Sequence, residues 1–333
     1  MSARAWGYFA AVSILWGMPY LLIKVDVDAG VPPAFVAWVR VVLGAAVLLC
    51  LVWRRGARAA LRGRLRWVAA FAVTEIAIPF PLIATGEQYV SSSLTAILIA
   101  AAPLFVALLA LRFDASERAS GWRLAGLLIG LAGVVALVGV DVAGRGDELL
   151  GAAAILVAAF FYAVGPMLLK HHLADLDPKL TMGASLAVAS LLLAPAAAHP
   201  PASIPSTAAL LSLAGLGVLC TALGLVCYGT LIAEVGAGRA LLVTYLNPVV
   251  AVALGVTIRG ERPGAGAAIG LVLILAGSWL SSRRQRPGEA VGGVDIDSSG
   301  TPEPTRVSGE GAVASETERR ASVPRRSGDH DER

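Results

Sequence analysis

Two ionisable residues, Arg40 and Glu75, each lie deep inside a long apolar stretch of this chain. On helices that rise about 1.5 Å per residue, both would lie near the middle of a membrane that these stretches crossed. A charge at that depth is costly unless it is paired or faces water. We therefore expect Glu75 to face a central cavity as a site for a proton or a substrate ammonium group, with Arg40 as its candidate partner. The alternative is a static ion pair that braces the two segments.

Hydroxyl, amide and aromatic groups also lie within otherwise apolar stretches. They suit the recognition of an amphipathic small molecule, because binding sites combine mostly apolar walls with few polar groups. Hydrogen bonding between neighbouring membrane helices is the competing interpretation. The residues concerned are Tyr20, Tyr228, Thr244, Tyr245 and Asn247.

Two prolines and a group of polar residues mark further candidate positions. Pro103 and Pro248 each remove a backbone hydrogen bond within an apolar stretch, so both are candidate helix breaks. Such a break either bends the helix or frees carbonyl groups for a ligand. Polar residues at the outer ends of their stretches form a candidate outer gate, although such residues also mark the boundary between membrane and water. These are Lys24, Glu87 and Gln88.

The composition indicates a membrane around these residues. Of the 333 residues, 57% are hydrophobic and only 15% are charged, whereas soluble domains are about 45–50% apolar and about 25% charged. A helix needs roughly 20 mostly apolar residues to cross a bilayer. We therefore predict an all-α integral membrane protein of ten transmembrane helices, near 6–25, 32–53, 67–86, 92–111, 121–140, 149–169, 180–198, 207–230, 238–257 and 264–281.

The basic residues predict the orientation of the chain. With the N-terminus inside, sixteen Lys and Arg residues lie in the inner segments and four lie in the outer loops. Because positively charged loops stay cytoplasmic, both termini are predicted to be cytoplasmic in the cell (inner) membrane. The inner residues are Arg4, Arg54, Arg55, Arg58, Arg62, Arg64, Arg66, Arg112, Arg118, Arg123, Lys170, Lys179, Arg239, Arg283, Arg284 and Arg286, and the outer ones are Lys24, Arg145, Arg259 and Arg262.

The chain also contains an internal repeat. At a shift of 144–146 residues, the segment 16–24 aligns with 162–170, Pro103 with Pro248, and Glu117 with Glu261. Repeats of five spans start on opposite sides of the membrane, so the two halves are inverted around a site near the midplane. The expected domains are a first repeat at 5–140, a second at 149–282, and a polar, disordered cytoplasmic tail at 287–333.

The motifs within the two repeats resemble the EamA-domain family of the drug/metabolite transporter superfamily. The resemblance rests on Trp-Gly-x-Pro-Tyr-x-x-x-Lys at 16–24, on the fourth span at 91–104, on its counterpart at 236–248, and on Glu117 and Glu261. It implies ten helices, cytoplasmic termini, a central cavity, and export or exchange of amino acids, metabolites or drugs. The second repeat departs from the first, because Tyr162 replaces Trp16 and Arg40 has no basic counterpart.

The sequence lacks the motifs of several other classes of protein. The phosphate-binding Gly-x-x-x-x-Gly-Lys-Ser/Thr loop and the His-Glu-x-x-His zinc motif are both absent. The three cysteines lie inside apolar stretches without metal-ligand spacing, so no metal or cofactor is expected. We expect a secondary transporter, with export favoured by the resemblance, rather than an enzyme. The alternative is an integral-membrane enzyme acting on a lipid-linked substrate, with Glu75 and Glu87 as acid–base groups.

The expected partners follow from this assignment. They are a small-molecule substrate, the lipid bilayer and, through Glu75, protons as a candidate coupling ion. The basic residues lie between the spans, so nucleic acid is not expected. Gly126 and Gly130 in the fifth span and Gly266 and Gly270 in the tenth allow close helix packing, either on each other or on a second copy, which leaves dimerisation open.

Overall fold

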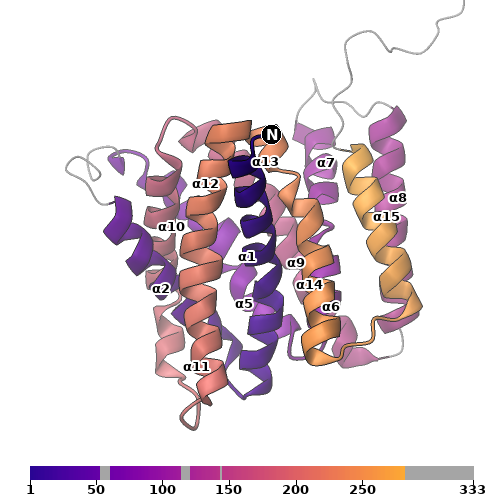
Figure 1. The fold of residues 1–333 in the computed structure, drawn as a ribbon, viewed down its shortest axis with the longest axis horizontal. Helices are drawn as coiled ribbons and strands as arrows, with labels where there is room; N and C mark the ends of the chain where they lie inside the picture. Colours follow the sequence, from indigo (N-terminus) through magenta and orange to yellow (C-terminus); the bar gives the residue numbers. More distant parts are fainter. Residues whose placement is uncertain (53–60, 114–120, 143–144, 282–333) are drawn as a thin grey trace, which may run out of the picture. The chain divides into compact units, whose positions relative to one another are not determined.

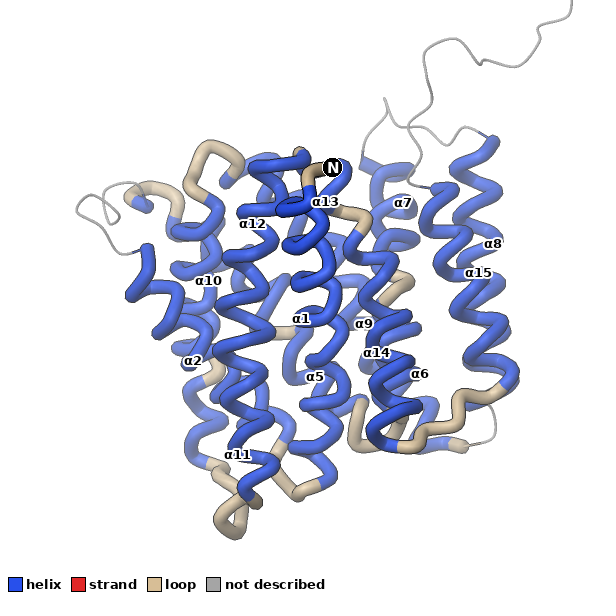
Figure 2. Tube along the Cα trace, in the orientation of Figure 1, coloured by secondary structure: helices blue, strands red, loops and turns tan. Residues whose placement is uncertain are grey.

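The computed structural model describes residues 1–52, 61–113, 121–142 and 145–281, and every regular element among them is a helix (Figures 1 and 2). The chain divides into two units, 1–285 and 286–333, and all the described helices belong to the first. The predicted tail at 287–333, Glu117, and the basic residues at 54, 55, 58, 118, 283, 284 and 286 lie outside the described residues.

The first half of the chain forms five apolar segments, several of them in more than one piece. They are α1 (Ala3–Asp28), α2 (Pro33–Val52), α4 (Leu65–Ala72) with η1 (Val73–Ala77) and α5 (Pro79–Gly86), α6 (Ser92–Ile99) with α7 (Ala102–Phe113), and α8 (Gly121–Leu137) with η3 (Val138–Val142).

The second half repeats this order. It contains α9 (Gly146–Leu168) with η4 (Leu169–Leu173), α10 (Pro178–Leu192) with η5 (Ala194–Ala198), α11 (Thr207–Ala214) with η6 (Gly215–Leu223) and α12 (Gly224–Val235), α13 (Ala237–Ala240) with α14 (Val243–Arg259), and α15 (Ala265–Ser281). Polar side chains cap the N-termini of several of these helices. Ser91, Asp177 and Ser206 each accept a hydrogen bond from a backbone N–H of the first turn.

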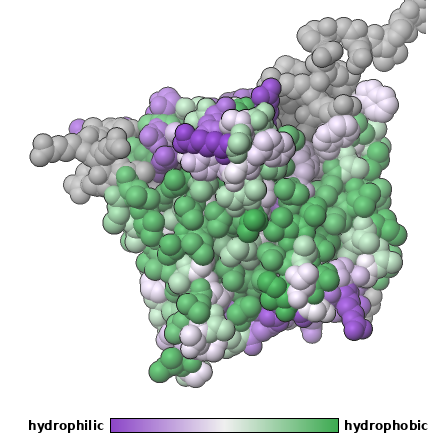
Figure 3. Space-filling model, viewed as in Figure 1, coloured by the Kyte–Doolittle hydropathy of each residue, from purple (hydrophilic) through white to green (hydrophobic). Residues whose placement is uncertain are grey.

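Seven of the described helical segments are long and apolar enough to cross a membrane. The other three apolar helices, α10, α14 and α15, have 15, 17 and 17 residues. The predicted positions of the spans agree with these segments, whereas the count of ten membrane crossings stays a prediction. Figure 3 shows hydrophobic side chains over the middle of one face, with hydrophilic ones gathered near both helix ends.

The most extensive contacts join helices of different halves. They pair α8 with α15, α2 with α10, α1 with α14, and α5 with α9. Since each of these pairs takes one helix from each repeat, the two repeats form one joint core and not two separate bundles.

Helices α8 and α15, which close their respective repeats, pack along their whole length (Figure 1). A methyl group added at Gly126 would lie 2.5 Å from the backbone nitrogen of Ser281, and one at Gly133 would lie 2.9 Å from that of Ile274. One at Gly270 would lie 2.9 Å from the Cβ of Leu137. Residue numbers rise in one helix as they fall in the other, so the matching helices are antiparallel, as inverted repeats require. Both Gly-x-x-x-Gly motifs therefore lie in a contact within one chain.

Interruptions of the helices recur at matching places in the two repeats. The third segment contains the π-helical η1, and its counterpart contains the π-helical η6. The fourth segment is interrupted between α6 and α7, just before Pro103, and its counterpart is interrupted between α13 and α14.

Pro248, predicted as a helix break, lies inside the continuous helix α14. The interruption in this span comes earlier, at residues 241–242. A proline removes only the single hydrogen bond that its own N–H would donate, here to the carbonyl of Thr244 near the start of the helix, and the rest of the helix continues.

Substitution of Gly277 tests the antiparallel contact. A side chain at Gly277 would meet the backbone of Gly130 and Gly126, which cannot move aside. We expect Gly277→Leu to destabilise the protein by about 1–3 kcal/mol or more and to lower its Tm by several degrees in detergent. Gly7→Leu is the matched control, because nothing lies within 4 Å of its added Cβ. Equal melting temperatures of the two variants would contradict the close packing.

Candidate functional site

Arg40 of α2 lies where the two repeats meet. Its Nε donates a hydrogen bond to the Oγ1 of Thr221 in η6 at 2.9 Å, and the Thr221 hydroxyl in turn donates to the carbonyl of Leu216 at 2.8 Å. The guanidinium carbon lies 3.9 Å from the centroid of the Phe80 ring in α5. A cation over an aromatic face is stabilised by the ring quadrupole, more strongly when water is excluded. Arg40 is therefore held in one orientation by residues from both halves.

Glu75 lies in η1, against α9 of the other repeat. A methyl group on Gly165 would collide with its Oε2, so the absence of a side chain there makes room for the carboxylate. This Oε2 is buried and has no hydrogen-bond partner among the described residues. The described residues also contain no ion pair between Glu75 and Arg40, so neither the expected partnership nor a static brace is formed in this conformation.

Two tyrosines lie in an apolar cluster that both repeats form. Tyr20 of α1 and Tyr162 of α9 pack against this cluster, which contains Ile23 and Leu216. Tyr162 precedes Gly165, the residue that Glu75 contacts, by about one turn of α9. Of the five polar residues proposed from the sequence, Tyr20 is the one that packs against this cluster.

The other four polar residues have different surroundings. Tyr228 packs against Trp16 with ring centroids 4.6 Å apart. Tyr245 donates a hydrogen bond to the carbonyl of Ser278 in α15, and Thr244 donates to the carbonyl of Leu241. The Tyr245 contact joins two helices, which is the competing interpretation, whereas the Thr244 contact is local. Asn247 lies on α14, and its buried Oδ1 has no partner among the described residues.

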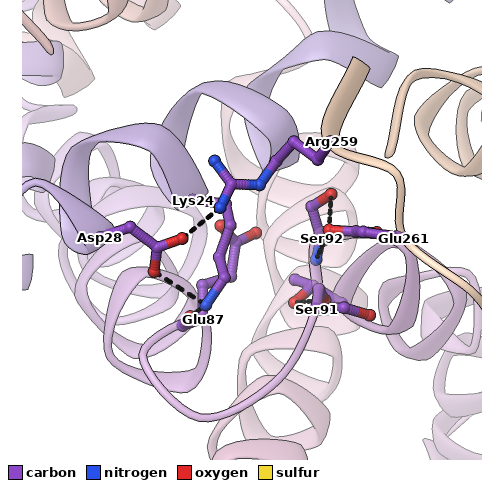
Figure 4. A network of polar contacts seen from close by, with 8 residues as sticks. Lys24, Asp28, Glu87, Ser91, Ser92, Arg259 and Glu261 are labelled. Carbon is purple, nitrogen blue, oxygen red and sulfur yellow. Dashed lines mark hydrogen bonds and ion pairs between the residues drawn. The ribbon is translucent and has the colours of Figure 1, made fainter. Parts of the chain in front are cut away.

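Lys24, near the C-terminal end of α1, is the centre of a polar network (Figure 4). Its Nζ donates to the backbone carbonyl of Glu87 at 2.8 Å and forms an ion pair with Asp28 at 3.0 Å. Asp28 also pairs with Arg259 at the end of α14, in the second repeat. The candidate gate residues Lys24 and Glu87 thus meet, whereas Gln88 is exposed. Both carboxylate oxygens of Glu87 are buried without a partner among the described residues.

Glu261, in the loop between α14 and α15, caps a helix of the other repeat (Figure 4). Its carboxylate accepts hydrogen bonds from the backbone N–H groups of Ser92 and Ser93, both at 3.0 Å, and from their hydroxyl groups. Burial disfavours the charged carboxylate, but these donors outweigh burial and lower the pKa of Glu261. The anion also lies at the N-terminus of α6, where the helix dipole favours a negative charge.

Four residues of this region were missed by the sequence analysis as site residues. Phe80 and Thr221 orient Arg40, Tyr162 lies one turn before Gly165 on α9, and Asp28 joins Lys24 to Arg259. Of these four, only Tyr162 could have been identified from the sequence, because it aligns with Trp16 in the internal repeat.

Two segments of the chain, 5–139 and 149–283, each match the model of one family, described as the EamA-like transporter family. The chain belongs to the EamA-like transporter family. These two matches coincide with the two halves that pack through α8 and α15 and that meet at Arg40 and Glu75. The EamA-like chain is thus a membrane transporter built from two repeats.

The names of several similar proteins agree with this membership. The EamA-like chain is 28% identical to the "Uncharacterized inner membrane transporter YedA" of Escherichia coli (strain K12), covering 77% of this chain and 83% of that protein. It is 27% identical to the "Probable terminal-alkyne amino-acid exporter" of Streptantibioticus cattleyicolor, covering 85% and 95%. It is also 27% identical to the "Probable amino-acid metabolite efflux pump" of Escherichia coli (strain K12), covering 81% and 92%.

A solved crystal structure shares the fold of this EamA-like chain. The two superimpose with a TM-score of 0.59 at 20% sequence identity, covering 85% of this chain and 97% of the other. At that identity the likeness concerns the fold alone.

The cap formed by Glu261 predicts a dependence of stability on pH. An unfolded Glu has a pKa of about 4.3, and the folded pKa is lower, so the ionised carboxylate stabilises the fold at higher pH and loses this effect as pH falls through the folded pKa. We expect Glu261→Gln to have a lower Tm than the unmodified protein at neutral pH. The difference should shrink below about pH 4.

Melting curves in detergent from neutral to acidic pH measure this effect. The matched control is Glu148→Gln, which removes an exposed ion pair with Arg145 and should change Tm little at any pH. A Tm difference for Glu261→Gln that stays constant as the pH falls would contradict the role of the ionised carboxylate.

Proposed function

We propose that this EamA-like protein is a secondary transporter that exports a small organic metabolite by alternating access. The observation that carries the proposal is the position of the charged residues within the spans. Arg40 of the first repeat bonds to Thr221 of the second, and Glu75 of the first repeat lies against Gly165 of the second. An interface between inverted repeats is where transporters of this plan bind substrate, because the site can then open to either side.

The names of the relatives support export over import. Two relatives that each align over more than nine-tenths of their length are named as an amino-acid exporter and an amino-acid metabolite efflux pump. We extend export and a metabolite substrate to this chain on that basis. Neither the family match nor these relatives support the integral-membrane enzyme considered as the alternative.

Contacts at the two ends of the helices support alternating access. At one end, Lys24, Asp28 and Arg259 join α1 to α14, and Glu261 joins the second repeat to α6. At the other end, Arg4 pairs with Glu234, and Arg64 pairs with Asp175. The second set is more exposed to solvent, and exposed ion pairs are weak. We propose that the first set closes the outer side in this conformation and breaks when substrate is released.

Several properties of the transporter remain proposals from the sequence. They are cytoplasmic termini in the cell membrane, a central cavity lined by Glu75, Arg40 and Tyr20, and protons as a coupling ion. The repeat boundaries at 5–140 and 149–282 belong with them. A dimer would have to use a surface other than the glycine faces of α8 and α15, because these face each other within the chain.

A reconstituted system tests transport directly. We expect purified protein in sealed proteoliposomes to move at least one compound from a panel of amino acids and cationic drugs, and an imposed pH gradient to change the rate if protons are coupled. Protein-free liposomes are the control. Failure across the whole panel by protein that remains folded would contradict the transporter proposal.

Loss of the outer contacts should expose the interior to the outside. Asp28→Asn removes the partner of both Lys24 and Arg259, so we expect the outer side to open more often. The reporter is Cys220, which is buried beside Thr221, after Cys50 and Cys227 are changed to Ser. An impermeant maleimide should then label it about two- to fivefold faster, as expected for a partly exposed ion pair worth up to about 1 kcal/mol.

The control for this experiment is Arg145→Gln, which breaks an exposed ion pair with Glu148 at the start of α9. It should leave the labelling rate of Cys220 unchanged. Equal labelling in the Asp28→Asn variant and in this control would show that the Lys24–Asp28–Arg259 contacts do not close the outer side.

A further inference from the structure

We propose that Asp26 of α1 is a proton-binding site at the proposed outer end of the protein, which holds its proton while this end is closed and releases it when this end opens. The inference rests on the proposed alternating access and adds a ligand to it. It starts from a carboxyl group with unusual surroundings. Asp26 has an exposed fraction of 0%, and neither of its side-chain oxygens has a hydrogen-bond partner among the described residues.

Two half-buried carboxylates elsewhere in this chain are given donors. Glu261 accepts hydrogen bonds from two backbone N–H groups and two hydroxyl groups. Asp141 in η3 accepts from two backbone N–H groups at the start of α15. A carboxylate that is buried without donors and without a cation is so costly that such a group takes up a proton instead. In the closed conformation Asp26 is therefore a neutral acid.

Apolar residues enclose Asp26 where α1 meets α11 of the second repeat. Ile23, one turn earlier on the same face of α1, packs in one apolar cluster with Val36 of α2 and Leu213 of α11. Neither α11 nor the first seven residues of α2 contain an ionisable side chain. The elements packed on this face thus supply no counter-ion.

The charged groups closest in sequence face the other way. Lys24 and Asp28 are each two residues from Asp26, which puts them about 160° away around the helix. On that side they meet Glu87 and Arg259 (Figure 4). Glu87 therefore has a cation beside it, whereas no ion pair among the described residues involves Asp26.

The next ionisable groups along the neighbouring elements do not supply a counter-ion either. His199, in the segment that leads to α11, is exposed, and Arg40 is bound by Thr221. Cys220 of η6 is buried and carries no positive charge in either of its forms. A metal ion does not fit, because the described residues contain no group of three His, Cys, Asp or Glu side chains that could hold one. A proton is thus the cation that this site takes.

Ser212 of α11 suits a neutral acid beside it. Its hydroxyl donates a hydrogen bond to the carbonyl of Leu22 at 2.8 Å. In a regular helix the backbone N–H of Asp26 donates to this same carbonyl, so the two side chains lie near one another. The single hydroxyl proton of Ser212 is already used, so its oxygen offers only lone pairs. Those lone pairs repel a carboxylate but not a protonated carboxyl group.

Opening of the outer side reverses these conditions. When α1 separates from α11, water reaches Asp26, and an Asp carboxyl in water is ionised above about pH 4. Closing then takes up one proton and opening releases one. Because the closed state binds the proton, acid on that side favours closure and a rise in pH favours opening, by up to about tenfold per pH unit. The closure therefore responds to the pH of the outer solution.

Distances across the closed end test this site in full-length protein in liposomes. Cys50, Cys220 and Cys227 are changed to Ser, and spin labels are attached to Ala29→Cys at the end of α1 and to Ala208→Cys on α11, both at exposed positions. Pulsed electron paramagnetic resonance gives the shares of short, closed distances and long, open distances. Between about pH 5 and pH 8 we expect the ratio of long to short distances to rise, by up to about tenfold per pH unit.

Two substitutions separate Asp26 from other titrating groups. Asp26→Asn carries an amide that stays neutral at every pH, so it should keep the short distance and remove the pH dependence. Asp147→Asn is the matched control, because it removes an exposed Asp at the start of α9. This control should keep the pH dependence of the unmodified protein.

The outcomes separate this inference from the proposed function. Equal pH dependence in Asp26→Asn and in the unmodified protein would assign the proton to another group and overturn the site. Two distances whose ratio ignores pH would also overturn it and leave alternating access intact. A single distance at every pH, even after Asp28→Asn has removed the ion pairs with Lys24 and Arg259, would contradict both. Melting temperatures and size-exclusion profiles show whether each variant is folded.

Discussion

A lipid bilayer offers no hydrogen bonds, and this constraint governs which groups the chain can put where. Each described regular element is a helix, which satisfies its backbone within itself. Two of the places where the helices depart from regular geometry, η1 and η6, lie beside the other repeat and carry Glu75 and Thr221. Polar groups that lipid cannot accommodate are thus gathered where the repeats meet, and a single physical requirement explains both the helical fold and the position of the site.

The two repeats are joined by two kinds of contact with different properties. Between α8 and α15 the contact is backbone against backbone through glycines, so it contains few side chains that can rearrange. At the ends of α1 and α6 the repeats are also joined by ion pairs and hydrogen bonds, among them Asp28 with Arg259 and Glu261 with Ser92. Contacts of the second kind can break and re-form at low cost, whereas the glycine contact suits a fixed support.

The sequence predicts much of the fold and only part of the site. Apolar length located the helical segments, and the depth of Arg40 and Glu75 within them identified both residues as exceptional. The sequence could not predict the contacts of Arg40, because Thr221 and Phe80 approach it from segments that are distant in the chain. The π-helical segments have no residue signature. From the sequence, a proline such as Pro248 predicts a helix break. In the structure, the helix around Pro248 is continuous.

The repeat is unequal at one decisive position. Helices α2 and α10 both begin at a proline, Pro33 and Pro178, and the same shift puts Ser185 where the first repeat has Arg40. Ser185 is buried, and its hydroxyl has no partner among the described residues. A duplication that had kept the arginine twice would have built two equivalent half-sites around the two-fold axis. With the guanidinium on one side alone, the two-fold framework of helices is chemically asymmetric where the repeats meet: a cation lies on the first repeat and a small hydroxyl group at the matching place on the second.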